Sequence, residues 1–277
     1  MPMGMIDDTA RIASGAEIGN GVSIGPYCVI GPHVRLGDNC RLEAHVHIAG
    51  HTTIGAGTKI QPFASLGSPP QSTGYKGGPT RLEIGENCDI REHVTMNIGT
   101  EFGGDVTRVG DRCLFMVGSH VGHDCIVGSQ VTLANNVLLG GHVEVGDNTF
   151  MGGGSGVHQF TRIGEGVMVS GVGGVAADVL PFGLVFGHRG YLAGLNVVGL
   201  KRRGASRADM HRLRAVYRLL FSGEGSMQER IDQVIALYGE DPLTGKVAAF
   251  LRGQGRRPLM KPGRRSGRER TESDEGE

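Results

Sequence analysis

A short histidine-rich stretch holds the residue types best suited to chemistry. It reads Ser119-His120-Val121-Gly122-His123-Asp124-Cys125. His123 is followed directly by Asp124, and a carboxylate beside an imidazole can orient the ring and stabilise its charged form. Such a pair is suited to general-base catalysis. Which other residues lie beside it depends on the fold.

An aliphatic residue recurs at every sixth position through most of the chain. One series runs from Ile6 to Leu66 and another from Val109 to Val175. Gly often follows the aliphatic residue, and the residue four positions on is small or β-branched. This is the hexapeptide repeat of a parallel β-helix. It predicts an all-β fold, a left-handed parallel β-helix of triangular coils, followed by a C-terminal α-helical extension.

The repeat also predicts which distant residues become neighbours. Three hexads make one coil, so residues 18 apart stack at the strand-to-strand distance of about 4.8 Å. Gly141 and then Gln159 should lie above His123, and His142 should lie above Asp124. A glycine N–H one coil from a general base is suited to stabilising an oxyanion, because the missing side chain permits close approach. The repeat therefore predicts one polar patch about two coils tall.

The chain divides into three predicted regions. Residues 1–200 form the β-helix, with Pro/Gly-rich excursions near 68–81 and 97–108. Long loops inserted in a regular scaffold commonly carry function. Residues 201–252 form a C-terminal helical domain, and the charged segment 253–277 is expected to be a disordered tail.

Two capping boxes mark helix starts in the C-terminal region. Ser206 with Asp209 precedes one helical pattern, and Ser226 with Glu229 precedes a second. Asp241-Pro242 marks the start of a third.

Composition limits the class of protein. The 28 basic and 28 acidic residues give a formal net charge of zero, which gives no indication of nucleic-acid binding. All five Cys fall on the small inward position of the repeat without C-x-x-C spacing, so we interpret them as core residues of a protein in a reducing, cytoplasmic compartment. The N-terminus does not read as a signal peptide, and no stretch is long and apolar enough for an integral membrane segment.

Five stretches together carry a resemblance to a known family. They are His120-Val-Gly-His-Asp-Cys125, Leu133-Ala-Asn-Asn136, Gly140-Gly-His-Val143, Val157-His-Gln-Phe160 and Gly199-Leu-Lys-Arg-Arg-Gly204. The chain resembles the acyl-carrier-protein-dependent UDP-N-acetylglucosamine acyltransferases, which start lipid A synthesis, over about residues 6–252. The bare hexapeptide repeat is shared by many transferases, whereas these motifs jointly are specific.

The resemblance implies transfer of a 3-hydroxyacyl chain from acyl carrier protein to the 3-position of UDP-N-acetylglucosamine. It implies His123 as general base, Asp124 as its orienting partner and the Gly141 backbone as oxyanion donor. The thioester is already activated, so no metal and no other cofactor is implied. The family is a homotrimer with active sites between subunits. Gly171 matches the position that limits acyl length, and the implied substrate-binding residues are Gln71, Tyr75, His120, His142, His158, Gln159, Asn196 and Arg202.

Three positions depart from the best-known members of the family. Ser72, Gly74 and Asn97 stand where those members carry Asp, Lys and His, which contact the sugar. Some relatives acylate a 3-amino analogue of the sugar, so O-acylation and N-acylation both remain open.

The carrier protein is expected to dock on a basic surface made by the end of the repeat and the first C-terminal helix. Acyl carrier proteins are acidic, so positive charge there steers association. The residues expected to form this surface are Arg203, Arg207, Arg212 and Arg214.

Two other classes of function compete with acyl transfer. A metal-dependent hydratase of the γ-carbonic-anhydrase kind would need three convergent His around zinc or iron. A non-enzymatic scaffold would favour a flat, regular Thr or Ser array. The His-Asp pair and the helical region favour the transferase over the hydratase, and the excursions and the irregular polar patch argue against the scaffold.

Overall fold

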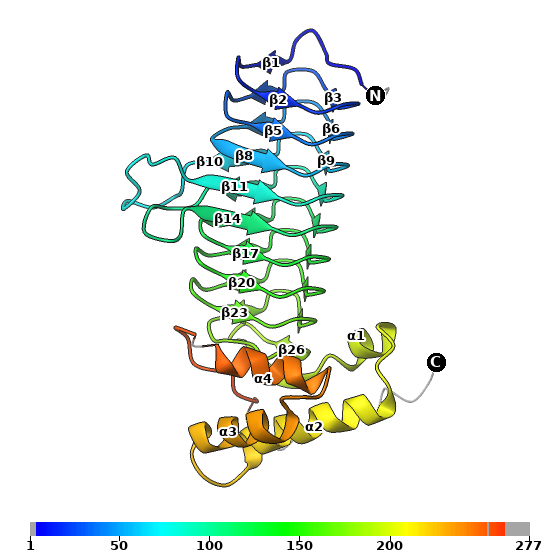
Figure 1. The fold of residues 1–277 in the computed structure, drawn as a ribbon, viewed down its shortest axis with the longest axis vertical. Coiled ribbons are helices and arrows are strands. Elements are labelled where there is room, and N and C mark those ends of the chain that lie inside the picture. The colour runs from blue at the N-terminus through cyan, green and yellow to red at the C-terminus, as the bar shows by residue number, and fades with distance from the viewer. Residues whose placement is uncertain (1–3, 254, 264–277) are drawn as a thin grey trace.

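The computed structural model describes residues 4–253 and 255–263. A column of short parallel strands makes up the larger part, and helices pack at its C-terminal end (Figure 1). Within the described residues the strands form three sheets of nine, eight and ten members, called sheets I, II and III here. The prediction of a left-handed parallel β-helix with a C-terminal helical extension is confirmed.

Sheet I contains β1 (Arg11–Ile12), β4 (Val29–Ile30), β7 (His47–Ile48), β10 (Ser65–Ser68), β13 (Thr95–Asn97), β16 (His120–Val121), β19 (Leu138–Leu139), β22 (Gly156–Val157) and β25 (Gly174–Val175). Sheet II contains β2 (Glu17–Ile18), β5 (Arg35–Leu36), β8 (His51–Ile54), β11 (Arg81–Ile84), β14 (Val106–Val109), β17 (Ile126–Val127), β20 (Glu144–Val145) and β23 (Arg162–Ile163). Sheet III contains β3 (Ser23–Ile24), β6 (Arg41–Leu42), β9 (Lys59–Ile60), β12 (Asp89–Ile90), β15 (Leu114–Phe115), β18 (Thr132–Leu133), β21 (Phe150–Met151), β24 (Met168–Val169), β26 (Gly183–Phe186) and β27 (Tyr191–Leu195).

The register gives the predicted 18-residue spacing wherever the repeat is uninterrupted. His120 pairs with Leu138, and Leu138 pairs with Gly156. The repeat aliphatic residues fill the interior, where Phe115 and Ile90 are fully buried. All five Cys are buried and unoxidised, as expected, and the Cys125 thiol donates to the Gly140 carbonyl of the next coil at 3.1 Å.

The corners between sheets I and II need a left-handed backbone. Asp124, His142 and Phe160 occupy successive corners at φ 59°, 60° and 64°. Asp and His tolerate this region better than most residues do. The corner therefore stacks an acid, an imidazole and an aromatic ring on three successive coils, and these three residues are called the corner column here.

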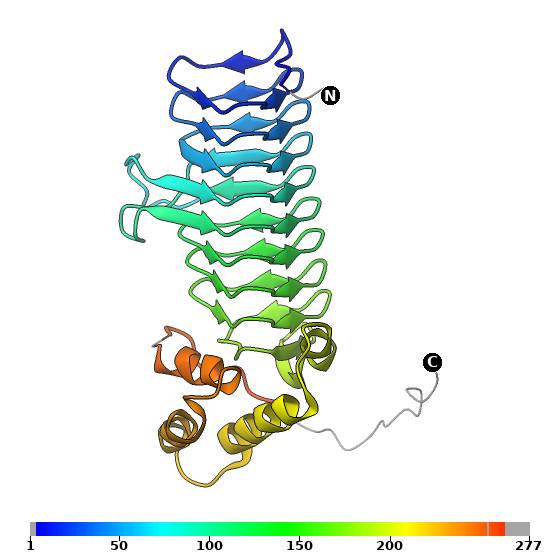
Figure 2. The same cartoon turned by 45° about the vertical axis from the view of Figure 1, so that its right-hand side comes forward.

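Two insertions leave the column side by side (Figures 1 and 2). They cover residues 69–80 and 98–105 between the flanking strands. The second was expected to run to residue 108, but β14 begins at Val106 and pairs in register with β11, so the insertion is shorter. Glu101 joins the two loops, because its Oε1 accepts hydrogen bonds from the Gly78 and Lys76 N–H groups at 2.7 and 3.2 Å.

Four helices follow the strands in the described part of the chain: α1 (Val197–Arg202), α2 (Arg207–Ser222), α3 (Met227–Tyr238) and α4 (Thr244–Arg252). Both predicted capping boxes are formed, at Ser206 and at Ser226. The third predicted helix, α4, begins at Thr244, later than the start that Asp241-Pro242 predicted. The Asp241 carboxylate, just before the helix, accepts from the Thr244 N–H at 2.9 Å. The short α1 lies partly within residues 1–200, where only β-helix was expected. No helix among the described residues could cross a membrane.

The segment after α4 packs back on the column, contrary to the disorder expected from residue 253. The Asp178 N–H donates to the Pro258 carbonyl at 2.8 Å, and the Met260 N–H donates to the Asp178 carbonyl at 2.7 Å. Met260 is buried and belongs to the hydrophobic core. The rest of the expected tail, residues 254 and 264–277, lies outside the described residues.

Candidate active site

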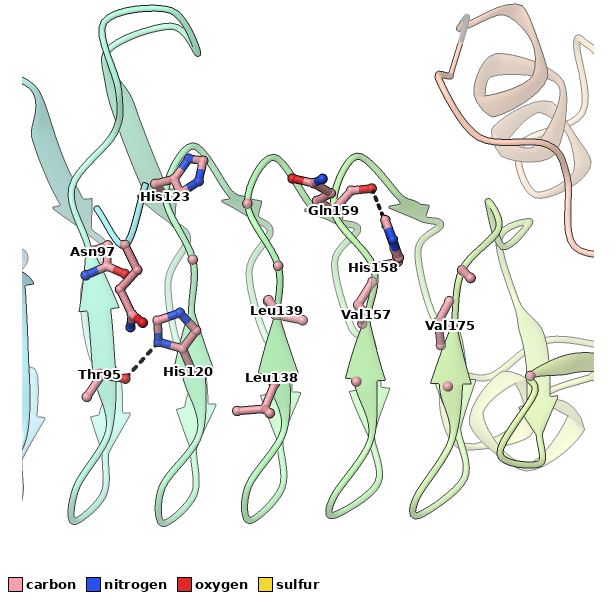
Figure 3. A pocket seen from close by; sticks show the side chains of 18 of the residues that line it. Thr95, Asn97, His120, His123, Leu138, Leu139, Val157, His158, Gln159 and Val175 are labelled. Carbon is pink, nitrogen blue, oxygen red and sulfur yellow. Dashed lines mark hydrogen bonds between the residues drawn. The ribbon is translucent and has the colours of Figure 1, made fainter. Parts of the chain in front are cut away.

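A cavity of about 1300 Å³ runs along the outer face of sheet I. Figure 3 shows its lining side chains on β13, β16, β19, β22 and β25 and on the turns that follow them. His120 and His123 lie toward the end near the insertions, and the 188–190 loop bounds the other end. Of the residues named from the sequence, it takes in His120, His123, Gly141 and also Gln71, His158 and Gln159.

His123 and Asp124 form the predicted pair. The distance from His123 Nδ1 to Asp124 Oδ2 is 2.8 Å. Because a carboxylate accepts, Nδ1 carries the proton in the neutral ring and Nε2 keeps its lone pair. Nε2 has no hydrogen-bond partner among the described residues. The ring is therefore held in the tautomer that a general base requires.

The second insertion covers Asp124, which is buried. Thr100 donates from its N–H to Oδ1 at 2.9 Å and from its hydroxyl to Oδ2 at 2.6 Å. A Cβ on Gly103 would lie 2.2 Å from the carboxylate, so the loop needs glycine there to approach this closely. Thr100 gives no signal in the sequence other than its place in a long insertion.

Gly141 lies beside the His123 ring, one coil further on. Its N–H donates to no acceptor in the described residues. A Cβ at this position would lie 2.5 Å from His123 Cε1 and 2.6 Å from Nε2. Glycine therefore leaves the imidazole uncovered, and its own N–H, which has no acceptor in the described residues, belongs to the same cavity wall as the ring. A backbone donor near a base is suited to stabilising an oxyanion.

Two further imidazoles flank the pair. His120 Nδ1 lies 2.8 Å from Thr95 Oγ1, and burial lowers the pKa of His120. His142 stacks on Phe160 with ring centroids 4.4 Å apart, and burial likewise lowers the pKa of His142. Both rings are uncharged near neutral pH, because the ordinary value is already below 7. They provide polar contacts without a positive charge that would compete for Asp124.

One cluster in the described part of the chain has the spacing of a metal site. Ligand atoms of His123, Asp124 and His142 lie within 4.8 Å of one another. The Asp124 carboxylate already accepts from Thr100 twice and from His123, and His142 Nε2 is 3.6 Å from it. This cluster offers two imidazoles and a carboxylate instead of the three histidines of the hydratase alternative. Because the Asp124 oxygens are already occupied by hydrogen bonds that orient His123, the cluster fits proton transfer better than metal binding.

Several residues named from the sequence lie outside this cavity. Tyr75 donates to the Gly78 carbonyl at 2.8 Å within the first insertion. Asn196 caps α1, accepting from the Gly199 N–H at 2.9 Å, and donates to the Gly166 carbonyl at 3.0 Å. Gly171 lies exposed in the turn between sheets III and I, and Arg202 lies exposed at the end of α1. A single chain does not bring these residues to His123.

Of the three departures from the family pattern, Ser72 and Gly74 lie in the first insertion and Asn97 ends β13. Asn97 lines the cavity, and its amide donates to the Ser68 and Pro69 carbonyls at 3.3 and 3.0 Å. Ser72 Oγ accepts from the Gly74 N–H at 3.3 Å. The Asn97 amide thus ties β13 to the start of the first insertion, whereas the Ser72 contact is local to the loop.

The four arginines named for carrier docking fall into two pairs. Arg212 bonds Asp209 and reaches Asp241 at 2.9 Å, and Arg203 lies over the Phe182 ring at 5.7 Å. Arg207 and Arg214 are exposed on α2 without an ion-pair partner among the described residues. Arg203 has no ion-pair partner among the described residues either, but its guanidinium lies against a ring of its own chain, whereas Arg207 and Arg214 have no such contact.

The sequence matches two protein-family models and several curated proteins. A family model described as UDP-N-acetylglucosamine O-acyltransferase, domain 2, matches residues 178–260, and one described as bacterial transferase hexapeptide (six repeats) matches residues 33–68. The acyl-[acyl-carrier-protein]–UDP-N-acetylglucosamine O-acyltransferase of Azorhizobium caulinodans is 53% identical over 264 residues, which cover 95% of this chain and 97% of that protein. The protein of the same name from Paracoccus denitrificans is 50% identical over 203 residues, 73% of this chain and 77% of that one.

Solved structures give the same result. The UDP-N-acetylglucosamine acyltransferase of Francisella novicida superposes with a TM-score of 0.90 at 34% identity, covering 94% of this chain and 95% of that one. The enzyme of that name from Campylobacter jejuni gives a TM-score of 0.86 at 34% identity, covering 93% of this chain and 99% of that one.

We expect Gly141→Ala to disrupt the site and Gly156→Ala to leave it intact. The new methyl at 141 would push the His123 ring away from Asp124, whereas a Cβ at 156, also in the cavity wall, meets nothing within 4 Å. Displacing a reacting group by about 1 Å costs on the order of 10² in rate. Crystal structures of both variants, with rate measurements, check this. An unchanged Nδ1–Oδ2 distance and rate in Gly141→Ala would contradict the proposed crowding.

Proposed function

The chain belongs to the family of acyl-[acyl-carrier-protein]–UDP-N-acetylglucosamine O-acyltransferases, and we propose that the His123 cavity is where it carries out that reaction. The enzyme transfers a 3-hydroxyacyl chain from acyl carrier protein to the 3-position of UDP-N-acetylglucosamine, the first step of lipid A biosynthesis. The observation that carries the assignment of residues is the oriented His123–Asp124 pair beside the free Gly141 N–H.

In the proposed mechanism His123 Nε2 takes the proton of the sugar 3-hydroxyl. The oxygen attacks the thioester carbonyl carbon, and the Gly141 N–H stabilises the resulting oxyanion. Collapse of the tetrahedral intermediate breaks the carbon–sulfur bond, and the proton on His123 passes to the departing thiolate. Asp124 keeps Nδ1 protonated throughout and stabilises the transient imidazolium.

The remaining cavity residues are proposed to bind the substrates. Gln71, His120 and Asn97 lie near the insertions, on the side where the acceptor sugar would meet His123. His158 and Gln159 lie one coil beyond Gly141. A neutral His120 can donate to or accept from a sugar hydroxyl without attracting the diphosphate away from its own site.

We also propose that the protein is a cytoplasmic homotrimer. Asn196, Arg202 and Gly171 lie away from the cavity of their own chain, so a neighbouring subunit would have to bring them to it. The five buried thiols support a reducing compartment.

Acyl carrier protein is proposed to dock on one face of α2. Arg207, His211, Arg214 and Arg218 are exposed and follow one another at helical spacings of four, three and four residues. Such residues share one face of a helix. The proposal centres on this face, because Arg212 is ion-paired with Asp241 and Arg203 lies against Phe182, while both stay candidates from the sequence for the edge of the docking surface.

His123→Ala should remove nearly all activity and leave the fold unchanged. Loss of a general base costs on the order of 10²–10⁴ in rate. His47→Ala is the matched control, because His47 is an exposed histidine on β7 of the same sheet and outside the cavity. Steady-state turnover and melting temperature check both variants. Turnover of His123→Ala within a few-fold of the wild type would rule out the mechanism.

Reversing the two free arginines should weaken use of the carrier protein. We expect Arg207→Glu/Arg214→Glu to raise the KM for acyl carrier protein on the order of tenfold and to leave the KM for the sugar nucleotide unchanged, because only the carrier is steered by this surface. The difference from wild type should shrink at high salt, where steering is screened. Arg11→Glu/Lys59→Glu makes the same charge change at exposed positions of the N-terminal coils. This control variant should leave the KM for both substrates at the wild-type value at low and at high salt. Equal effects on both substrates would argue against α2 docking.

Gly171→Met should shorten the preferred acyl chain without abolishing activity. A Cβ at this position meets only the Gly153 carbonyl, at 3.4 Å, so the fold can accept a side chain there. Mass spectrometry of products from a pool of acyl carrier proteins measures the chain length, and the alkaline lability of the product separates an ester from an amide. An unchanged chain-length profile would remove Gly171 from this role.

A further inference from the structure

The segment of residues 255–263, called the C-terminal strap here, is fastened to the last coils just beyond two arginines. Asp178 pairs with Leu259 as a parallel bridge, and Leu192 pairs with Pro262. The Leu192 N–H also donates to the Lys261 carbonyl of the strap at 3.0 Å. These backbone contacts fix the position of the strap, and with it the positions of Arg256 and Arg257 at its start.

Arg257 reaches the wall of the catalytic cavity. Its Nε donates to the Gln159 carbonyl at 3.1 Å, and its Nη2 lies 2.5 Å from His158 Nδ1. One guanidinium thus spans two consecutive residues of the turn after β22, both of which line the cavity. The fixed fork of the guanidinium holds the two acceptors in one arrangement.

The contact determines the tautomer of His158. A guanidinium has only donors and stays protonated, so Nδ1 must accept. The proton of the neutral ring is then on Nε2. The 3.3 Å approach of His158 Nδ1 to the Gln159 carbonyl, drawn in Figure 3, is then a contact without a shared proton, since both atoms are acceptors.

We propose that Arg257 is a positioning residue, which fixes His158 as a hydrogen-bond donor through Nε2 toward an oxygen of the bound substrates. This rests on the proposed function, because it assumes that acyl transfer takes place in the His123 cavity. The oxygen belongs either to the thioester of the carrier or to the diphosphate of the sugar nucleotide. Without Arg257 the ring exchanges between tautomers and rotamers, and the donor is present only part of the time.

A double-mutant cycle tests whether Arg257 acts through His158. Arg257→Ala should lower kcat/KM on the order of tenfold, the size expected for one hydrogen bond. His158→Gln provides an amide donor that has no tautomers, so Arg257→Ala should add little in that background. The substrate whose KM rises in Arg257→Ala identifies the oxygen: acyl carrier protein for the thioester, sugar nucleotide for the diphosphate.

Lys261→Ala is the matched control within the strap. Its side chain is exposed, and the backbone carbonyl that anchors the strap remains. We expect wild-type kinetics and an unchanged melting temperature. The proposal would be overturned by any of three results: an equal loss of kcat/KM in Lys261→Ala, no loss of kcat/KM in Arg257→Ala, or effects of Arg257→Ala and His158→Gln on kcat/KM that are fully additive. All of these variants keep wild-type His123, so a negative result would overturn only the role of Arg257. The mechanism itself would be overturned by a different result, an active His123→Ala variant.

Discussion

The stacking of one coil on the next determines where each functional group lies. At the corner of the site the His142 N–H donates to the His123 carbonyl at 2.9 Å, and the Phe160 N–H donates to the Gly141 carbonyl at 3.1 Å. These backbone bonds hold Gly141 beside the His123 ring regardless of the side chains on the outer face. The proposed oxyanion donor is therefore part of the scaffold and would need little reorganisation during the reaction.

The periodic part of the site is predictable from the sequence, and the non-periodic part is not. The 18-residue step predicts Gly141 above His123 and His142 above Asp124, and the register confirms both. Thr100 lies in an insertion, where the step no longer applies, so its bond to Asp124 leaves no periodic signal. Arg257 lies in a Gly/Arg-rich stretch whose composition is typical of a disordered tail. Its position depends on bridges formed across many residues of sequence.

The second insertion makes the buried carboxylate tolerable. An ionised group removed from water is costly unless its oxygens are satisfied. Thr100 supplies two donors to Asp124 and His123 supplies a third, while a glycine at 103 lets the loop lie against the carboxylate. Glu101, the next residue after Thr100, ties this loop to the first insertion. The first insertion is thus connected to Asp124, and through it to the orientation of the His123 ring, by two adjacent residues.

The corner column also keeps a competing cation away from the His123–Asp124 pair. From Asp124 the column passes to His142, at 3.6 Å, and then to the Phe160 ring, over which Arg256 lies at 4.5 Å. Burial lowers the pKa of His142, so the ring beside Asp124 is uncharged near neutral pH. An arginine in direct contact with Asp124 would form a bidentate pair and take the oxygen that orients His123. With an imidazole and an apolar ring in between, the strap can approach the site while Asp124 remains paired with the base.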